Sequence, residues 1–205
     1  MERERITISI KKDLLSKIDS RIDGLRMRNR SHAIEIIISE SFGIGQIDTA
    51  VIMAGGKGAL KLIPIIEDSL QKLSGLGIRK VYIAVGYLGN KIKQNLSGNH
   101  NVEIEYIEGG EGTAGSLNLI KKQVKKTFII INTDQAFDFE LKKIVDFHNK
   151  HLPALTLAST NQSMKGIYIA ETEIFDFIED GFSMLEEDIF PKLLEKNKLL
   201  IYPIL

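Results

Sequence analysis

The sequence has no cysteine among its 205 residues, which excludes disulfide bonds and thiolate metal sites. It has no net charge either, because 27 lysines and arginines balance 27 aspartates and glutamates, so composition alone indicates no nucleic-acid partner. No apolar run approaches the roughly 20 residues that cross a bilayer, and no signal peptide opens the chain. We therefore expect no membrane partner and a cytoplasmic location.

Apolar residues, by contrast, are plentiful. They make up 43% of the chain against 26% for charged residues, which are ordinary proportions for a protein with a real core. A length of 205 residues fits one ordinary domain with a small additional module. The hydrophobic pattern changes near residue 44, and we expect a small domain over residues 1–44 and a larger one over residues 45–205.

The small domain begins with a strand pattern. In the stretch RITISI, residues 5–10, isoleucines alternate with polar residues, as in a half-buried strand. Apolar residues then recur at helical spacing and predict a helix over residues 12–24. Ser31 is the expected cap of a second helix, which ends at Gly43. The predicted order is one strand and two helices.

A lone strand has no partner for its backbone hydrogen bonds. A unit of this size is also close to the lower limit, about 40 residues, at which a domain folds unaided. Both difficulties disappear if two copies pair their strands antiparallel and pack their helices together. We therefore expect a homodimer or higher oligomer with twofold symmetry, held by the first domain.

The small domain resembles the ribbon-helix-helix repressors in RITISI, in the helix KKDLLSKIDSRID and in NRSHAIEIIISESF. That resemblance implies a paired ribbon in the DNA major groove of a palindromic or repeated operator. Outward strand residues would read bases, and the start of the second helix would hold a phosphate. The alternative is a dimerisation module whose polar ribbon face is only solvated. The residues implied to contact DNA are Arg5, Thr7, Ser9, Arg28, Arg30 and Ser31.

The larger domain alternates apolar runs with amphipathic segments, which predicts an α/β fold with a mainly parallel, Rossmann-like sheet covered on both faces. Ligands in such sheets bind beyond the carboxyl ends of the strands. The predicted strands are DTAVIM, RKVYIAV, VEIEYI, TFIIIN, ALTLAS, GIYIA and KLLIYPI. The predicted helices lie near residues 60–75, 89–96, 115–125, 138–151, 171–179 and 184–196.

This domain resembles the sugar-phosphate nucleotidyltransferases in VIMAGGKG, EGTAGSL, IIINTDQAF, GIYIAETEIFDFI and LEEDIFPKLLEKNKLLIYPI, in the family's order. The resemblance implies a nucleotide or nucleotide-sugar site and a magnesium-binding aspartate at Asp134. The alternative is that the glycines now serve only tight turns. The residues implied to hold the nucleotide are Gly55, Gly56, Lys57, Gly58, Gly112, Thr113, Ala114 and Gly115.

The sequence departs from that family at its catalytic groups. Gly58 is followed by Ala59 and Leu60 where the family has an arginine, and the segment with the catalytic lysine is missing. The family's second metal-binding aspartate would follow Leu205. Because nucleotidyl transfer depends on cations around the phosphates, we expect little or no catalysis, no required cofactor, and magnesium only in an active enzyme.

Together these features predict a dimeric, sequence-specific DNA-binding transcriptional regulator with a catalytically degenerate nucleotidyltransferase-like domain as scaffold or ligand sensor. The alternative is an active minimal sugar-phosphate nucleotidyltransferase that its first domain dimerises. An antitoxin-like protein is a third hypothesis. The histidines show no metal-ligand spacing, and the acidic residues 186–188 are typical of a solvated first helical turn.

Overall fold

A computed structural model describes residues 4–24, 27–41, 47–55, 59–86, 89–96, 100–133, 141–159 and 164–204. The chain divides into two compact units, Met1–Gln46 and Ile47–Leu205. None of the helices within the described ranges has both the length and the apolar character needed to cross a membrane.

The first unit contains two helices, α1 (Lys12–Asp19) and α2 (Arg30–Ser41). The strand predicted over residues 5–10 does not form, because the described part of this unit offers no second strand to pair with it. Helix α1 ends at Asp19, earlier than predicted. The amides of Arg21 and Ile22 bond in tight turns to the carbonyls of Ile18 and Asp19, at 3.0 and 3.1 Å, and the chain leaves the helix there.

The residue that caps α2 is Asn29, and not Ser31 as predicted. The Asn29 side-chain oxygen accepts a hydrogen bond of 3.0 Å from the backbone amide of His32. The Asn29 carbonyl in turn accepts the first helical bond, 2.9 Å from the amide of Ala33. This is the usual geometry of an N-cap residue. Ser31 already lies inside the helix and is exposed.

The second unit is built on one seven-stranded sheet in the order β3-β2-β1-β4-β6-β5-β7. Every neighbouring pair is parallel except those that involve β6, which runs antiparallel to β4 and β5. The predicted mainly parallel α/β fold is confirmed. The strands are β1 (Thr49–Ala54), β2 (Lys80–Val85), β3 (Glu103–Ile107), β4 (Phe128–Asn132), β5 (Leu155–Ser159), β6 (Met164–Ala170) and β7 (Leu199–Pro203).

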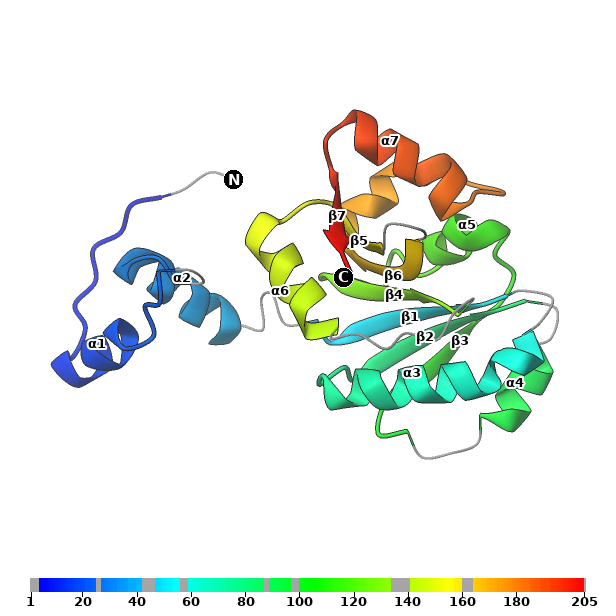
Figure 1. Ribbon diagram of the computed structural model, residues 1–205, viewed down its shortest axis with the longest axis horizontal. Coiled ribbons are helices and arrows are strands. Elements are labelled where there is room, and N and C mark those ends of the chain that lie inside the picture. Colours follow the sequence, from blue (N-terminus) through cyan, green and yellow to red (C-terminus); the bar gives the residue numbers. More distant parts are fainter. Residues whose placement is uncertain are drawn as a thin grey trace. The chain divides into compact units, whose positions relative to one another are not determined.

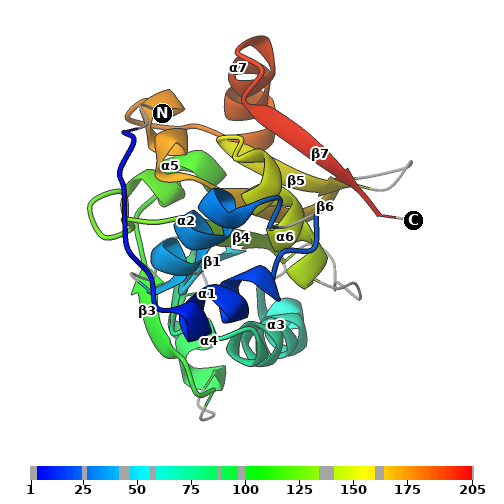
Figure 2. The ribbon, with the colours of Figure 1, turned by 90° about the vertical axis from the view of Figure 1, so that its left-hand side faces the viewer.

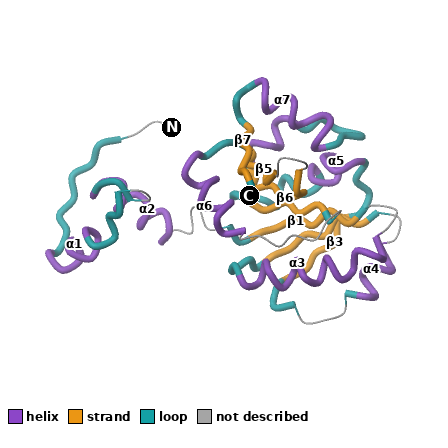
Figure 3. The backbone as a smooth tube through the Cα atoms, viewed as in Figure 1, coloured by secondary structure: helices purple, strands orange, loops and turns teal. Residues whose placement is uncertain are grey.

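Helices cover both faces of this sheet (Figures 1 and 3). On one face lie the 3-10 turn η1 and three helices: η1 (Ala59–Leu62), α3 (Ile63–Gly75), α4 (Gly89–Asn95) and α6 (Leu141–His151). The opposite face carries α5 (Gly112–Asn118), the 3-10 helix η2 (Thr172–Phe177), the π-helical turn η3 (Leu185–Ile189) and α7 (Phe190–Glu195). Figure 2 shows α7 and α3 on opposite sides of the strands.

Two apolar cores result, one on each face. Ile66, Leu70 and Leu73 recur along α3 at helical spacing and are fully buried against the sheet. On the other face Tyr168 of β6 packs edge-on against Phe190 of α7, with ring centroids 5.1 Å apart. Because both faces are covered, β1 is buried over five consecutive residues, as expected for a central parallel strand.

Candidate functional site

A cavity of about 450 Å³ lies at the carboxyl ends of the parallel strands, on the face of α5 and η3. It extends from the ends of β2 and β1 to β4 and β6, which follow one another in the sheet. Open α/β sheets bind ligands at this end of their strands. Its lining residues are Met53, Gly55, Leu62, Ala84, Val85, Gly86, Gly110, Gly112, Thr113, Ser116, Asn132, Thr133, Tyr168, Met184, Leu185, Glu186 and Glu187.

Two glycines meet at the β1–β2 side of the cavity. A Cβ atom on Gly86 would lie 2.6 Å from the carbonyl oxygen of Gly55, so no side chain fits at Gly86, whereas a Cβ atom on Gly55 would have its nearest neighbour at 3.8 Å. Gly55, predicted to hold a nucleotide, and Gly86 both line the cavity, and neither has a side chain that would cover its backbone there. Such a surface lets a ligand approach the main chain. The predicted residues Gly56, Lys57 and Gly58 lie outside the described residues.

The start of α5 is bonded to the segment before η3. The amides of Ala114 and Gly115 both donate to the carbonyl of Ser183, at 2.9 and 3.2 Å. These two amides, predicted to face a nucleotide, are therefore already engaged, and both residues are buried. Gly112 and Thr113 do line the cavity. The Thr113 hydroxyl oxygen accepts a bond of 2.9 Å from the amide of Leu185, which leaves its proton available to a ligand.

The floor of the cavity is the end of β4. The hydroxyl of Thr133 donates to the carbonyl of Met53 at 2.8 Å and ties the end of β4 to β1. Asn132, beside it, is partly exposed, and its side chain has no hydrogen-bond partner within the described residues. An amide can donate and accept, so Asn132 offers both functions to a ligand. Asp134, the predicted magnesium ligand, lies outside the described residues.

The polar wall of the cavity is a tyrosine–glutamate pair that the sequence analysis missed. The hydroxyl of Tyr168 donates to Oε1 of Glu186 at 2.5 Å. Glu186 and Glu187 were interpreted as a solvated helical turn, and that interpretation fails for Glu186, which is partly buried and lines the cavity. No local sequence pattern indicates this pair, because Tyr168 and Glu186 lie 18 residues apart on different elements.

The charge of the lining is negative. Its described residues include two glutamates and no lysine or arginine. Across the described ranges, no group of three or more histidines, aspartates or glutamates is placed to hold a metal ion. The described residues alone therefore do not form a magnesium site. The lysine next to the lining residue Leu62 in sequence, Lys61 of η1, is exposed.

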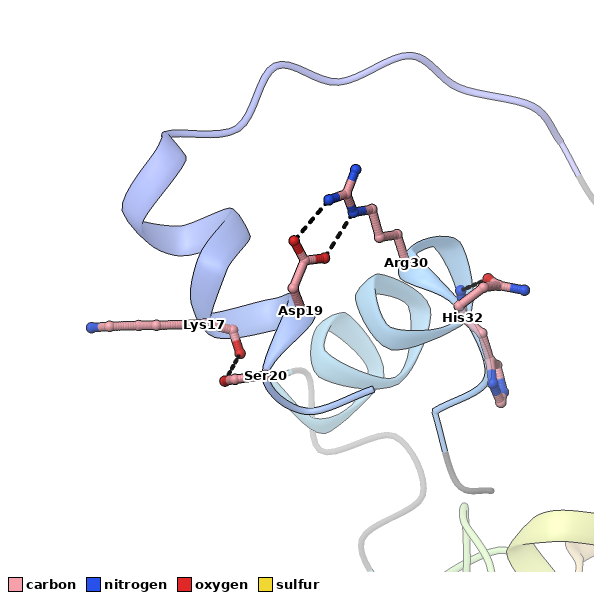
Figure 4. A network of polar contacts seen from close by, with 6 residues as sticks. Lys17, Asp19, Ser20, Arg30 and His32 are labelled. Carbon is pink, nitrogen blue, oxygen red and sulfur yellow. Dashed lines mark hydrogen bonds and ion pairs between the residues drawn. The ribbon is translucent and has the colours of Figure 1, made fainter. Parts of the chain in front are cut away.

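The residues predicted to contact DNA all belong to the first unit. Arg5, Thr7 and Ser9 are exposed in the unpaired segment before α1, and Arg28 and Ser31 are exposed as well. Arg30 instead forms a bidentate ion pair with Asp19, with Nε–Oδ1 and Nη2–Oδ2 distances of 2.7 and 2.8 Å (Figure 4). The hydrogen bond from Arg30 lowers the pKa of Asp19.

A buried polar cluster lies at the other end of the strands, where β4 and β5 begin. His148 of α6 is fully buried, with Nδ1 2.9 Å from the Thr156 hydroxyl and Nε2 3.1 Å from Oε1 of Glu171. The Thr127 hydroxyl donates to the same Glu171 oxygen at 2.7 Å. Burial raises the pKa of Glu171, but the hydrogen bonds from His148 and Thr127 and the electrostatic interaction with His148 outweigh it, and the pKa is lowered. This cluster connects α6 to the sheet, away from the cavity.

Comparison with known proteins finds similarity to nucleotidyltransferases. No family model matches the chain. A mannose-1-phosphate guanyltransferase of Candida albicans is 25% identical over 177 residues, which cover 66% of this chain and 49% of that protein. The chain thus spans about half the length of the curated relatives it matches.

Solved structures show the same fold. A candidate glucose-1-phosphate thymidylyltransferase from Bacillus anthracis, solved with sucrose, has a TM-score of 0.64 and 17% identity, over 77% of this chain and 87% of that one. HddC from Yersinia pseudotuberculosis, complexed with GMP-PN, has a TM-score of 0.60 and 16% identity, over 77% and 91%. Residues 47–204 therefore have a nucleotidyltransferase-like fold.

These comparisons contradict the main function predicted from the sequence, a DNA-binding transcriptional regulator. The similar proteins are sugar-phosphate nucleotidyltransferases, and they favour the alternative hypothesis. A ribbon-helix-helix module is not shown, because residues 4–11 form no strand in the single chain.

Proposed function

We propose that residues 47–204 bind a nucleotide or nucleotide sugar in the cavity and act as a sugar-phosphate nucleotidyltransferase. The observation that carries this proposal is the cavity itself, which lies at the carboxyl edge of a nucleotidyltransferase-like sheet. In the proposed reaction a sugar-phosphate oxygen bonds to the α-phosphorus of a nucleoside triphosphate. The bond to the β-phosphate oxygen breaks, and pyrophosphate leaves.

The described residues would position the reactants. Bare backbone at Gly55 and Gly86 lets the ligand lie against the main chain, and Thr113 and Asn132 offer hydrogen bonds to it. Neutralisation of phosphate charge would fall to the lysines near the lining residues in sequence, Lys57 and Lys61. If magnesium takes part, Asp134 and the substrate phosphates would hold it, because the ion often takes its ligands from both.

A coupled assay for pyrophosphate tests the transfer. The full chain is mixed with nucleoside triphosphates, mannose 1-phosphate or glucose 1-phosphate, and magnesium chloride. We expect release of pyrophosphate that Asp134→Ala abolishes, while Asp68→Ala, on the exposed face of α3, retains it. Thermal-shift measurements with the same nucleotides test binding separately, since a native-state ligand raises stability by mass action. A thermal shift without release of pyrophosphate would refute transfer only. The absence of both signals would refute transfer and binding.

We further propose that the first unit forms a homodimer with a second copy of the chain. Of residues 4–24 and 27–38 in this unit only Met27 and Ala33 are buried, whereas Ile6, Ile8 and Leu14 are 70%, 49% and 50% exposed. So small a core does not offset the conformational entropy that the unit loses on folding. We therefore expect a partner to cover these side chains. An identical copy does so by pairing the unpaired segment with itself.

A further inference from the structure

A short run of lysines, KKQVKK at residues 121–126, joins α5 to β4. From residue 112 to residue 132 the chain contains these four lysines and no acidic residue, although the chain as a whole has no net charge. All four lysines are exposed. Because a run of like charge is often only solvated, the surroundings of these lysines decide whether they form a binding surface.

The core beneath this segment fixes its backbone. Ile120 and Val124 are each 3% exposed and belong to the core on the face of α5. The amide of Val124 donates to the carbonyl of Ile120 at 3.0 Å and closes one helical turn between them. The lysines are therefore presented at the surface by an anchored turn. We call residues 119–126 the basic turn.

Three of the four lysines in the basic turn have no carboxylate partner. Lys126 pairs with Asp48, with an Nζ–Oδ2 distance of 3.2 Å. Within the part of the chain that the structure describes, Lys121, Lys122 and Lys125 form no salt bridge. Three positive charges thus remain for a partner outside the chain.

Two carboxylates do bond to residues that flank the basic turn, and neither pairs with its lysines. Oδ1 of Asp180 accepts a hydrogen bond of 3.2 Å from the side-chain amide of Asn118. Oε1 of Glu171 accepts one of 2.7 Å from the hydroxyl of Thr127 and lies in the buried cluster with His148. The flanks of the basic turn therefore supply no ion pair that would neutralise it.

The basic turn also has an exposed apolar side chain. Leu119, two residues before the first lysine, is 48% exposed. Lysines beside an exposed apolar residue are typical of surfaces that bind anionic lipid headgroups, because charge attracts the headgroups and the apolar side chain leaves water. The turn precedes β4, whereas Asn132 and Thr133 line the cavity at the other end of that strand.

From these observations we propose that the basic turn is a docking surface for an anionic phospholipid membrane. The three unpaired ammonium groups bind headgroup phosphates, Leu119 inserts between the headgroups, and the cavity stays open at the far end of β4. We expected no membrane partner because no apolar run crosses a bilayer, but a surface contact needs no such run. The inference goes beyond the proposed function and does not depend on it.

Cosedimentation of the full chain with lipid vesicles tests the proposal. The probes are vesicles of phosphatidylcholine alone and vesicles of equal parts phosphatidylcholine and phosphatidylglycerol. Each lysine near an anionic surface strengthens binding about fivefold, so three should favour the anionic vesicles about a hundredfold. High salt should remove most of that preference. The double variant Lys121→Gln with Lys122→Gln should weaken binding to anionic vesicles about 25-fold.

The matched control is the double variant Lys91→Gln with Lys142→Gln. It removes the same charge from exposed sites on α4 and α6, which cover the opposite face of the sheet. Its binding to anionic vesicles should stay close to that of the parent protein. An equal loss in both double variants would show that net charge, and not the basic turn, attracts the vesicles, and would overturn the proposal.

A fluorescent label locates the contact. Because the chain has no cysteine, Leu119→Cys carries a single thiol for an environment-sensitive dye, and Leu76→Cys, at an exposed site that follows α3, is its control. Anionic vesicles should shift the emission to shorter wavelength at position 119 and not at position 76. Equal binding to both kinds of vesicle, or to neither, would overturn the proposal. So would binding of poly-glutamate without binding of vesicles, which would assign the basic turn to an acidic protein.

Discussion

The imidazole Nε2 of His148 lies 3.1 Å from Oε1 of Glu171, so a fully buried histidine of α6 is paired with the carboxylate that follows β6. Helix α6 is thereby anchored to the sheet by a polar contact as well as by its apolar face. A carboxylate in this position stabilises the fold only while it is ionised.

Acid should therefore weaken the second unit through Glu171. Its folded pKa lies below the ordinary value of 4.5, so its stabilisation is present above that value and is lost as pH falls through the folded pKa. Urea unfolding followed over roughly pH 3 to 7 should show stability falling at the acid end. Glu171→Gln should flatten that fall, and Glu195→Gln, at an exposed site, should not. Equal curves for Glu171→Gln and the parent protein would contradict the prediction.

The glycine that begins α5 should tolerate no side chain. Gly112 has φ +77, and a Cβ atom there would lie 2.3 Å from the carbonyl oxygen of Ser183. Gly77 has φ +84 with nothing within 4 Å, so it shares the backbone strain without the clash. We expect Gly77→Ala to cost about 1 kcal/mol and Gly112→Ala about 1–3 kcal/mol more. Chemical denaturation of both variants measures the difference. Similar losses in the free energy of unfolding would show that the backbone at Ser183 moves to accommodate the side chain.

The ion pair of the first unit should be visible in a titration. The hydrogen bond and charge of Arg30 lower the pKa of Asp19. Arg30→Ala should raise that pKa toward its ordinary value of 3.8, and high salt should raise it partly in the parent protein. Carbon-detected NMR of the Asp19 carboxyl supplies the value. Arg28→Ala is the control. An Asp19 pKa that is the same in Arg30→Ala and in the parent protein would refute the pairing in solution.

The proposed homodimer should depend on the exposed isoleucines of the first unit. Ile8→Asp places a charge where the second copy is expected to bury an apolar side chain, and the cost of burying it should yield monomers. Leu194→Asp changes a residue of α7 that is 53% exposed and should leave the dimer intact. Sedimentation at micromolar protein measures the assembly. A parent protein that sediments as a monomer would rule out the dimer.

The strands of the second unit could be predicted because their signal is local. Each is a short apolar run between turn residues, and all seven form at or within two residues of the predicted positions. The strand over residues 5–10 has an equally clear alternation. It does not form, because a strand needs a partner and its own sequence does not say where that partner is.

The candidate site was predictable only where backbone decides it. Gly112 could be predicted as a required glycine, since few other residues adopt a φ of +77. Glu186 was missed because an acidic residue at the start of a helix usually faces water. Its role depends on Tyr168, 18 residues earlier and on another element, and no local pattern joins the two.

The π-helical turn Leu185–Ile189 gives the cavity an unusual genetic sensitivity. A π-turn is a helical turn that holds one residue more than an α-helical turn. Removing one residue rotates the chain before the deletion by about 100° relative to the chain after it, since an α-helix has 3.6 residues per turn. Loss of a single codon here would carry Glu186 away from Tyr168 and leave α7 in place. A one-residue deletion can thus change the wall of the proposed binding cavity, a route that scans of amino-acid substitutions do not sample.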